Sequence, residues 1–591
     1  MINKKHVKVD YSKDALFDSV GLQRLQDSYM RSDEKSPQDR FSYVARSFAS
    51  NPEHAQRLYN YLSNHWLSAA TPILSYGLGK RGMPISCFLS YIDDSAEGLI
   101  NTLAEACWLS ILGGGVGLGL GIRSADNKSV GVMPHIKTYE AAALAYRQGK
   151  TRRGSFAMYL NIDHPDIVQF IQMRKTTGDQ SQRALEMHHG VNISDKFMEI
   201  IEACMLDENA NDDWPLIDPN SGDVKEVVSA KWLWEMMLET RFSPAGEPFM
   251  HFIDTSNRAF GYQKALGLSI KQSNICTEII QATDKDRTAV CCLSSLNLEY
   301  FDSWSKDPQF IHDVVEMLDN ALEVFIKKAP KTVKRAIFSA QRERSIGIGE
   351  LGFHAYLQQH NIPWETATAL GVVHKIEKHI TDCCAKAEKR LQKERGSCPD
   401  AIEVGVKKRF THMRAIAPNA TSSILMGNTS PSIEPFRANA YRQDTLSGIG
   451  FNRNKYLARI IDGLSVSQKR RDDIWSSIIT SKGSCQHIPE LDEWTKAVFK
   501  TASEIDQRWV VSLAAARQQY LDQSQSVNLN FLPNVEIAYL HHVHFQAWKQ
   551  GLKTLYYCRM DKVYSGDALS NTQERVSFEL TTGEECLACE G

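Results

Sequence analysis

The chain has 591 residues, and its 68 basic and 70 acidic residues leave a formal net charge of -2, which gives no basic field for binding nucleic acid. Neither the first residues nor the most apolar stretch, CWLSILGGGVGLGLGI, has the pattern of a secretion signal or the length of a membrane span, so we expect a cytoplasmic protein without a membrane partner. Thirteen cysteines in so long a chain do not form a disulfide scaffold, and clustered thiols in a reducing compartment indicate metal, redox or radical chemistry.

Three regions follow one another along the chain. Residues 1–70 carry apolar residues three and four apart, which predicts a helical N-terminal region, and Ser36-Pro37 marks the start of one helix. Residues 71–561 alternate short apolar runs with helical patterns, which predicts one large α/β domain. Residues 562–591 are polar and end in EECLACEG, which predicts a flexible tail with a C-x-x-C motif.

Glycine and histidine motifs give weaker signals. GLGKRG (77–82) has the spacing of a dinucleotide fingerprint, but Pro84 follows closely and no strand–helix unit completes it. GGGVGLGLG (113–121) lacks the ending of a phosphate loop, which favours a tight turn into a buried strand. LHHVHF (540–545) has no second ligand cluster, so we expect helical or surface histidines there and predict no metal site.

Further motifs leave alternatives open. APNATSSIL (417–425) places hydroxyls ahead of a helical run, which suits either a phosphate site or a plain helix cap. Tyr556 and Tyr557 would ordinarily be core residues of a strand or helix. Cys586 and Cys589 have redox spacing but no surrounding βαβ unit, which excludes a thioredoxin fold and leaves an exposed dithiol possible.

The stretch SNICTE crowds an amide, a thiol and a carboxylate. In an extended segment alternate residues face the same side, so Asn274, Cys276 and Glu278 would point at one small volume. This pattern indicates an active site, although a buried structural cysteine is the alternative. Two more cysteines, Cys291 and Cys292, follow in VCCLSSLNL.

Taken together, the motifs resemble the large (alpha) subunit of class I ribonucleotide reductase. The matching stretches occur in family order and include LSAATPILSYGLGKRGMPISCFLS, GGGVGLGLGIRS, QGKTRRGS, SNICTEI with VCCLSSLNL, APNATSSIL, GLKTLYY and CLACEG. The resemblance implies a ten-stranded α/β barrel of two five-stranded parallel halves set antiparallel. The SNICTE segment would lie on a loop through its centre, and residues 71–561 would be the catalytic domain.

The resemblance also implies a reaction, the reduction of ribonucleoside diphosphates to 2'-deoxyribonucleoside diphosphates as DNA precursors. Cys276 would carry the thiyl radical that removes the 3' hydrogen of the substrate. Glu278 would act as the base for the 3' hydroxyl, and Asn274 would orient the sugar. The reducing dithiol would be Cys87 with Cys291; Cys292 lies beside Cys291, but the VC-x-L register of the motif favours Cys291.

Other positions carry implied roles in binding and electron supply. Five hydroxyl residues would hold the substrate diphosphate: Thr71, Ser86, Thr421, Ser422 and Ser423. Tyr556 and Tyr557 would relay the oxidising equivalent from a separate beta subunit with a metal-based radical cofactor, so this chain would bind no cofactor covalently. Cys586 and Cys589 would reduce the inner disulfide and be reduced by thioredoxin or glutaredoxin.

Regulation is implied only in part. Residues 1–50 already resemble the start of the catalytic part, so we expect no N-terminal ATP-cone module and no on/off nucleotide site. Specificity effectors, dNTP or ATP, would bind at a homodimer interface near four residues: Asp94, Arg123, Gln148 and Arg153. Two alternatives are a class II reductase that depends on adenosylcobalamin and a non-catalytic regulatory homologue. A non-catalytic homologue would lack a residue of the family's catalytic set, and this sequence has all of them.

Overall fold

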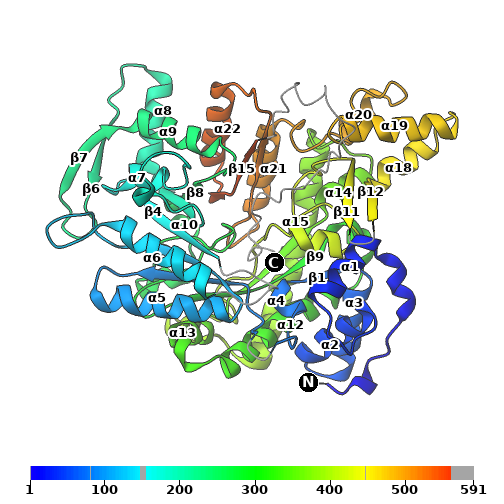
Figure 1. Ribbon diagram of the computed structural model, residues 1–591. Coiled ribbons are helices and arrows are strands. Elements are labelled where there is room, and N and C mark those ends of the chain that lie inside the picture. Colours follow the sequence, from blue (N-terminus) through cyan, green and yellow to red (C-terminus); the bar gives the residue numbers. More distant parts are fainter. Residues whose placement is uncertain (1, 80–81, 147–154, 446–447, 561–591) are drawn as a thin grey trace.

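A computed structural model describes residues 2–79, 82–146, 155–445 and 448–560 (Figure 1). The N-terminal region folds into short helices: α1 (Ser19–Ser28), α2 (Pro37–Phe48) and α3 (Pro52–Ser63). Ser36 caps α2 by accepting a hydrogen bond from the backbone of Gln38, and Pro37 takes the first helical position, as the sequence predicts. The last residues of the range expected to be helical instead form strand β1 (Leu67–Ala69), which pairs with the barrel sheet.

Five parallel strands form the first half of the barrel. Their order in the sheet follows the chain: β2 (Cys87–Ile92), β3 (Gly115–Leu120), β4 (Phe156–Asn161), β5 (His188–Ile193) and β8 (Phe249–Phe252). Parallel strands need crossover connections, and helices supply them. These helices include α5 (Ala96–Ile111), α6 (Val132–Ala145), α7 (Ile167–Ile171), α8 (Asp195–Leu206) and α9 (Ala230–Arg241). A hairpin of β6 (Asp213–Ile217) and β7 (Val224–Ser229) lies outside this sheet.

The second half runs in the opposite direction. β9 (Ala289–Asn297) pairs antiparallel with β2, and β10 (Ile346–Leu351) pairs parallel with β9. Parallel bridges continue this half from Ile348 to Arg414 and from Ile416 to Gln525. β14 (Thr554–Leu555) then pairs antiparallel with β8, and the backbone N–H of Tyr556 donates to the oxygen of Val527. The α/β barrel is therefore confirmed: the described residues contain a nine-stranded sheet, in which the parallel strands of the first half and the β9–β10 pair run in opposite directions.

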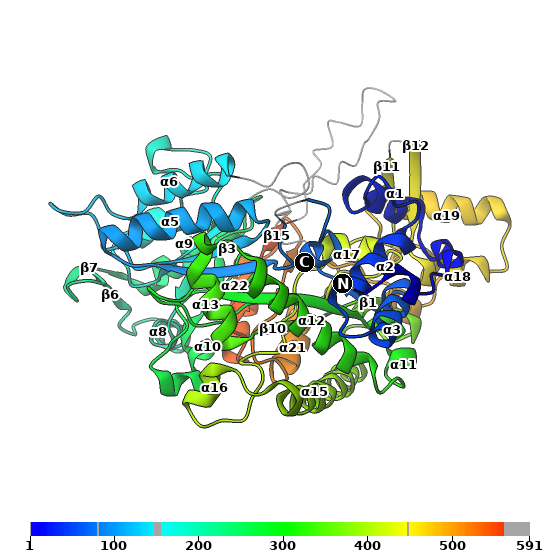
Figure 2. The same cartoon turned by 90° about the horizontal axis from the view of Figure 1, so that it is seen from below.

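Helices cover the outside of the barrel (Figures 1 and 2). Every residue of β9 is buried, as expected for a strand covered on both faces. The helices of the second half include α12 (Phe310–Lys328), α13 (Lys334–Glu343), α15 (Ala367–Arg395), α21 (Gln507–Gln518) and α22 (Ile537–Lys549). The LHHVHF motif lies in α22, where His544 is buried, so the expectation of helical histidines is correct.

A smaller layer has its own apolar core beside the barrel. It contains the hairpin of β11 (Ala440–Thr445) and β12 (Gly448–Arg453) and the helices α18 (Lys455–Asp462) and α19 (Gln468–Thr480). Figure 2 shows this layer next to α1–α3, while α5 and α6 lie at the other end of the molecule. Within the described residues, no helix is long and apolar enough to cross a membrane.

Candidate active site

The segment from Ser273 to Ile279 passes through the inside of the barrel and is completely buried. It contacts strands of both halves: the Tyr159 hydroxyl on β4 donates to the backbone oxygen of Asn274 at 2.6 Å, and Thr554 on β14 donates to the oxygen of Thr277 at 2.9 Å. A Cβ atom on Gly117 of β3 would lie 2.2 Å from the Ser273 oxygen. The glycines of GGGVGLGLG therefore make room for this segment, and the motif leads into the buried strand that the sequence predicts.

This segment is a turn rather than an extended strand. The backbone N–H of Thr277 donates to the oxygen of Asn274 at 3.4 Å, and Thr277 has a positive φ of 68°. The prediction of an extended segment was therefore wrong, because the chain bends inside the barrel instead of joining a sheet. The turn nevertheless brings Asn274 and Glu278 together, since the Asn274 side-chain oxygen accepts from the backbone of Ile279 at 3.0 Å.

Asn274 and Glu278 meet at the sulfur of Cys87. Because the side-chain oxygen of Asn274 accepts from the backbone, its amide nitrogen points the other way and lies 3.3 Å from Cys87 Sγ. The Cys87 thiol in turn donates to Glu278 Oε1 at 3.7 Å. An amide donor, a thiol and a carboxylate thus share one buried volume.

Burial sets the protonation of Glu278. Loss of solvation raises its pKa to about 7, against smaller opposing effects of hydrogen bonds from Asn274, Cys87 and Ser526. A carboxyl group that is half ionised near neutral pH can both take and return a proton. The site can therefore support acid–base chemistry beside a thiol.

Cys87 and Cys291 are direct partners across β2 and β9. Opposed residues of an antiparallel pair lie roughly 4.5–5.5 Å apart at Cα, within the range that a disulfide spans. Cys292 faces the other side of β9, where its sulfur lies 3.5 Å from the backbone oxygen of Pro84. The alternation of side chains along a strand thus favours Cys291 over Cys292 as the partner of Cys87.

Tyr556 and Tyr557 continue from β14 toward the turn. Tyr556 packs in one buried cluster with Cys276 and Phe249, and its ring centroid lies 4.3 Å from that of Tyr557. Tyr557 is only partly buried and also contacts Phe249, with 5.1 Å between centroids. The two rings are therefore in contact from a half-buried position to the buried cluster that contains Cys276.

Family models match most of the chain. Residues 85–405 and 401–558 match the ribonucleotide reductase barrel domain, and residues 15–82 match the ribonucleotide reductase all-alpha domain. The chain belongs to the ribonucleotide reductase family.

Similar proteins carry related descriptions. The ribonucleoside-diphosphate reductase large subunit of Invertebrate iridescent virus 3 is 47% identical over 99% of this chain and 100% of its own length. A putative ribonucleoside-diphosphate reductase large subunit of Frog virus 3 is 44% identical over 91% of this chain and 93% of its own. Among solved structures, the Actinobacillus ureae class Id ribonucleotide reductase alpha subunit superposes with a TM-score of 0.80 and 30% identity, and the match covers 94% of this chain and 99% of that one.

In this ribonucleotide reductase chain, two short helices adjoin the cysteine pair. α4 (Thr71–Leu74) and α17 (Ala420–Leu425) begin just after Ala70 and Ala417–Asn419, and both alanines pack with Cys87 and Cys291. Asn419 makes no capping bond to α17, so the plain helix cap is not what the structure contains. All five hydroxyl residues assigned to the phosphate are buried near these helices and β2: Thr71, Ser86, Thr421, Ser422 and Ser423.

The residues expected to bind effectors are only partly described. Asp94 and Arg123 follow the ends of β2 and β3 and form an ion pair with 2.6 Å between Oδ2 and Nε. Gln148 and Arg153 lie outside the described residues, as do Cys586 and Cys589 of the C-terminal motif.

Sequence reasoning missed the segment DQSQS. Ser526 donates to the backbone oxygen of Cys276 and, at 3.4 Å, to Glu278 Oε2, while Gln523 reaches Cys291. Both side chains are fully buried. After Asp522, a run of uncharged polar residues between helix α21 and an apolar strand was the available signal, because buried polar residues need hydrogen-bond partners.

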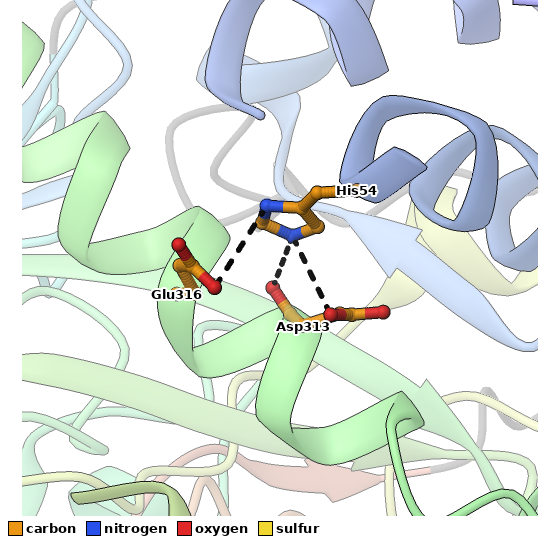
Figure 3. Close-up of side chains that lie close together, drawn as sticks. All are labelled: His54, Asp313 and Glu316. Carbon is orange, nitrogen blue, oxygen red and sulfur yellow. Dashed lines mark hydrogen bonds and ion pairs between the residues drawn. The ribbon is translucent and has the colours of Figure 1, made fainter. Parts of the chain in front are cut away.

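A histidine and two carboxylates gather between α3 and α12 (Figure 3). His54 Nε2 lies 3.1 Å from the backbone oxygen of Asp313, and Nδ1 accepts from a backbone N–H at 3.3 Å. The ring nitrogens are therefore occupied and leave no lone pair for a metal. Ion pairs also occupy the carboxylates of Asp313 and Glu316, with Arg57 and Arg395 respectively. These contacts hold helix α3 of the N-terminal region against helix α12 of the barrel domain.

Proposed function

We propose that this chain is the catalytic subunit that reduces ribonucleoside diphosphates to 2'-deoxyribonucleoside diphosphates. The observation that supports this most directly is the buried group of Asn274, Cys276 and Glu278 beside the Cys87–Cys291 pair inside the barrel. The names of the viral relatives identify the substrate class. Membership of the ribonucleotide reductase family supports radical reduction at a ribose as the chemistry.

Each residue then has a chemical task. A thiyl radical on Cys276 takes the 3' hydrogen, Glu278 takes the 3' hydroxyl proton, and the 2' hydroxyl leaves as water. Cys87 and Cys291 supply two electrons and two protons and become a disulfide, after which Cys276 returns the hydrogen. In the overall reaction, one ribonucleoside diphosphate and one dithiol give one deoxyribonucleoside diphosphate, one disulfide and one water molecule.

The oxidising equivalent would come from outside this chain. The metal-based radical cofactor of a beta subunit would supply it, and Tyr557 followed by Tyr556 would carry it to Cys276. The contact between the two rings and the burial of Tyr556 against Cys276 support this direction. Shielding from water protects the radical, and the complete burial of the turn provides that shielding.

Hydroxyl side chains at the starts of two short helices would bind the substrate diphosphate. Anions bind well where hydroxyls and backbone N–H groups converge, and α4 and α17 adjoin the cysteine pair. Cys586 and Cys589 would reduce the Cys87–Cys291 disulfide by thiol exchange and would themselves be reduced by thioredoxin or glutaredoxin.

A homodimer would place effectors near α5 and α6. Large apolar side chains are exposed on these neighbouring helices and just before and just after α6, namely Ile100, Trp108, Val130, Leu144 and Tyr146. An exposed apolar patch of this kind marks an interaction surface. Asp94 and Arg123 lie at the adjoining strand ends, so dNTP or ATP would bind beside the interface.

A reduction assay with and without an added beta subunit tests the function. We expect deoxynucleotide formation only with the beta subunit, and Cys276→Ser should reduce it below about 1% of wild type without loss of folding. Activity with adenosylcobalamin and no partner would instead favour a class II enzyme. Absence of activity under every condition would favour a non-catalytic homologue.

A further inference from the structure

The sulfur of Cys291 is held by a side chain whose orientation is fixed. Gln523 accepts at Oε1 from the backbone N–H of Ile280 at 3.3 Å and from Gln281 Nε2 at 3.1 Å. Its Nε2 therefore points the other way and donates to Cys291 Sγ at 3.5 Å and to the backbone oxygen of Ile346 at 3.3 Å. Gln523 is completely buried, so this donor cannot turn toward water.

A second donor and a strand enclose the same sulfur. The Ser345 hydroxyl accepts from Gln281 Nε2, and its own hydrogen is directed to the Cys291 sulfur. On β10, a Cβ atom at Gly347 would lie 3.2 Å from Cys291 Sγ, so backbone packs directly on this side. Cys291 is thus closed off by Gln523, Ser345 and β10.

The environment of Cys87 is different. Its sulfur faces Asn274 and the Glu278 carboxyl, which are the groups assigned to the substrate ribose. A thiolate on Cys87 would be repelled by an ionised Glu278 only 3.7 Å away. Burial and, to a smaller extent, the charge of Glu278 raise the pKa of the Cys291 thiol to about 12, while hydrogen bonds from Gln523 and Ser345 act in the opposite direction. A thiolate that leaves on Cys291 therefore depends on these two hydrogen-bond donors.

We propose that the Cys87–Cys291 disulfide is reduced with fixed direction: the incoming thiolate attacks Cys87, and Cys291 leaves as a thiolate held by Gln523 and Ser345. Exchange at sulfur requires the attacking and leaving sulfurs on opposite sides of the attacked atom, and Cys87 is the cysteine that faces the groups assigned to the substrate ribose. The new bond joins the incoming sulfur to Cys87, the Cys87–Cys291 bond breaks, and its electron pair stays on Cys291. The second thiol of the dithiol then releases Cys87.

Gln523 and Ser345 are positioning residues in this step. The inference rests on the proposed function, because it assumes that these two cysteines form the working disulfide. It adds the order of bond changes and two residues outside the ribose-binding set.

Adduct mapping on the full chain tests the direction. The protein is oxidised with diamide, treated briefly with 2-mercaptoethanol at pH 8, quenched with acid, and alkylated with N-ethylmaleimide for peptide mass spectrometry. We expect mercaptoethanol on Cys87 and maleimide on Cys291 in most of the trapped intermediate. The reverse pattern, or equal labelling, overturns the proposal but leaves the proposed function intact, whereas failure to form the disulfide overturns both.

A matched pair of variants tests the positioning residues. Gln523→Met keeps side-chain length but removes the donor, and it should slow reduction of the disulfide by dithiothreitol about 10-fold and make labelling less selective. Gln525→Met is the control, because Gln525 is equally buried in the same segment and its amide donates to Ala514 instead of a sulfur. Equal rates and equal selectivity in the two variants would exclude the role of Gln523. If Gln523→Met does not fold, the wild-type labelling pattern still decides the direction of attack.

Discussion

At the scale of single residues, burial determines the chemistry of Glu278. Its carboxyl has a pKa of about 7 in the folded protein and an ordinary value of 4.5 when solvated. The folded state therefore binds more protons than the unfolded state between these values, and this contribution to stability falls as pH rises from 4.5 to about 7. The same ionisation produces the base that the reaction needs.

Replacing Glu278 tests both consequences. We expect Glu278→Gln to lower the rate of deoxynucleotide formation about 100-fold or more, because the base is removed. The fall of the unfolding temperature between pH 4.5 and 7 should become shallower than in wild type. Parallel activity assays and thermal unfolding curves check this, and an unchanged pH slope would show that Glu278 is not the buried titrating group.

The proposed relay through Tyr556 and Tyr557 can be tested by removing only the phenol oxygen of each side chain. Tyr556→Phe and Tyr557→Phe should each abolish turnover with a beta subunit while folding and substrate affinity stay near wild type, because phenylalanine keeps the ring contacts but lacks the redox-active phenol. Tyr520→Phe serves as the control, since Tyr520 contacts His374 on the outer helix α15. Turnover in either pair variant at the level of this control would rule out the relay.

At the scale of elements, β3 and the 273–279 turn fit only because β3 is rich in glycine. A Cβ at Gly117 would lie 2.2 Å from the Ser273 oxygen and 2.7 Å from Asn274 Cα. These are backbone atoms, so a methyl group here must displace the turn that carries Cys276.

We therefore expect Gly117→Ala to lower activity at least 100-fold and to destabilise the fold by about 1–3 kcal/mol. Gly371→Ala in helix α15 is the control, because a Cβ at Gly371 would have no neighbour within 4 Å and alanine favours a helix. Activity and denaturant unfolding of the two variants provide the measurement. A Gly117→Ala enzyme with normal activity would mean that the turn tolerates displacement.

At the scale of the whole molecule, the α5–α6 end is proposed as the homodimer surface. Ile100 on α5 is 67% exposed, and Ile402 on α16 (Pro399–Glu403) is similarly exposed at 64%. Ile100→Glu should weaken dimerisation at least 10-fold in sedimentation velocity, whereas Ile402→Glu should not. Equal behaviour of the two variants would contradict the assignment of the interface to α5.

By its patterning, the sequence itself predicted a large α/β domain and the helix start at Ser36, because apolar spacing and capping residues are local signals. The resemblance of its motifs to a known family named the candidate reactive residues from Cys87 to Tyr557. The sequence could not determine that residues 274–277 form a turn, since an extended prediction assumes a neighbouring strand that the barrel interior does not offer. The motif already favoured Cys291 over Cys292, but only the register between β2 and β9 gives a physical reason, since it places Cys291 opposite Cys87. The contacts of Gln523 and Ser526 with the site likewise join residues more than 200 positions apart, and only tertiary packing brings such groups within hydrogen-bond distance.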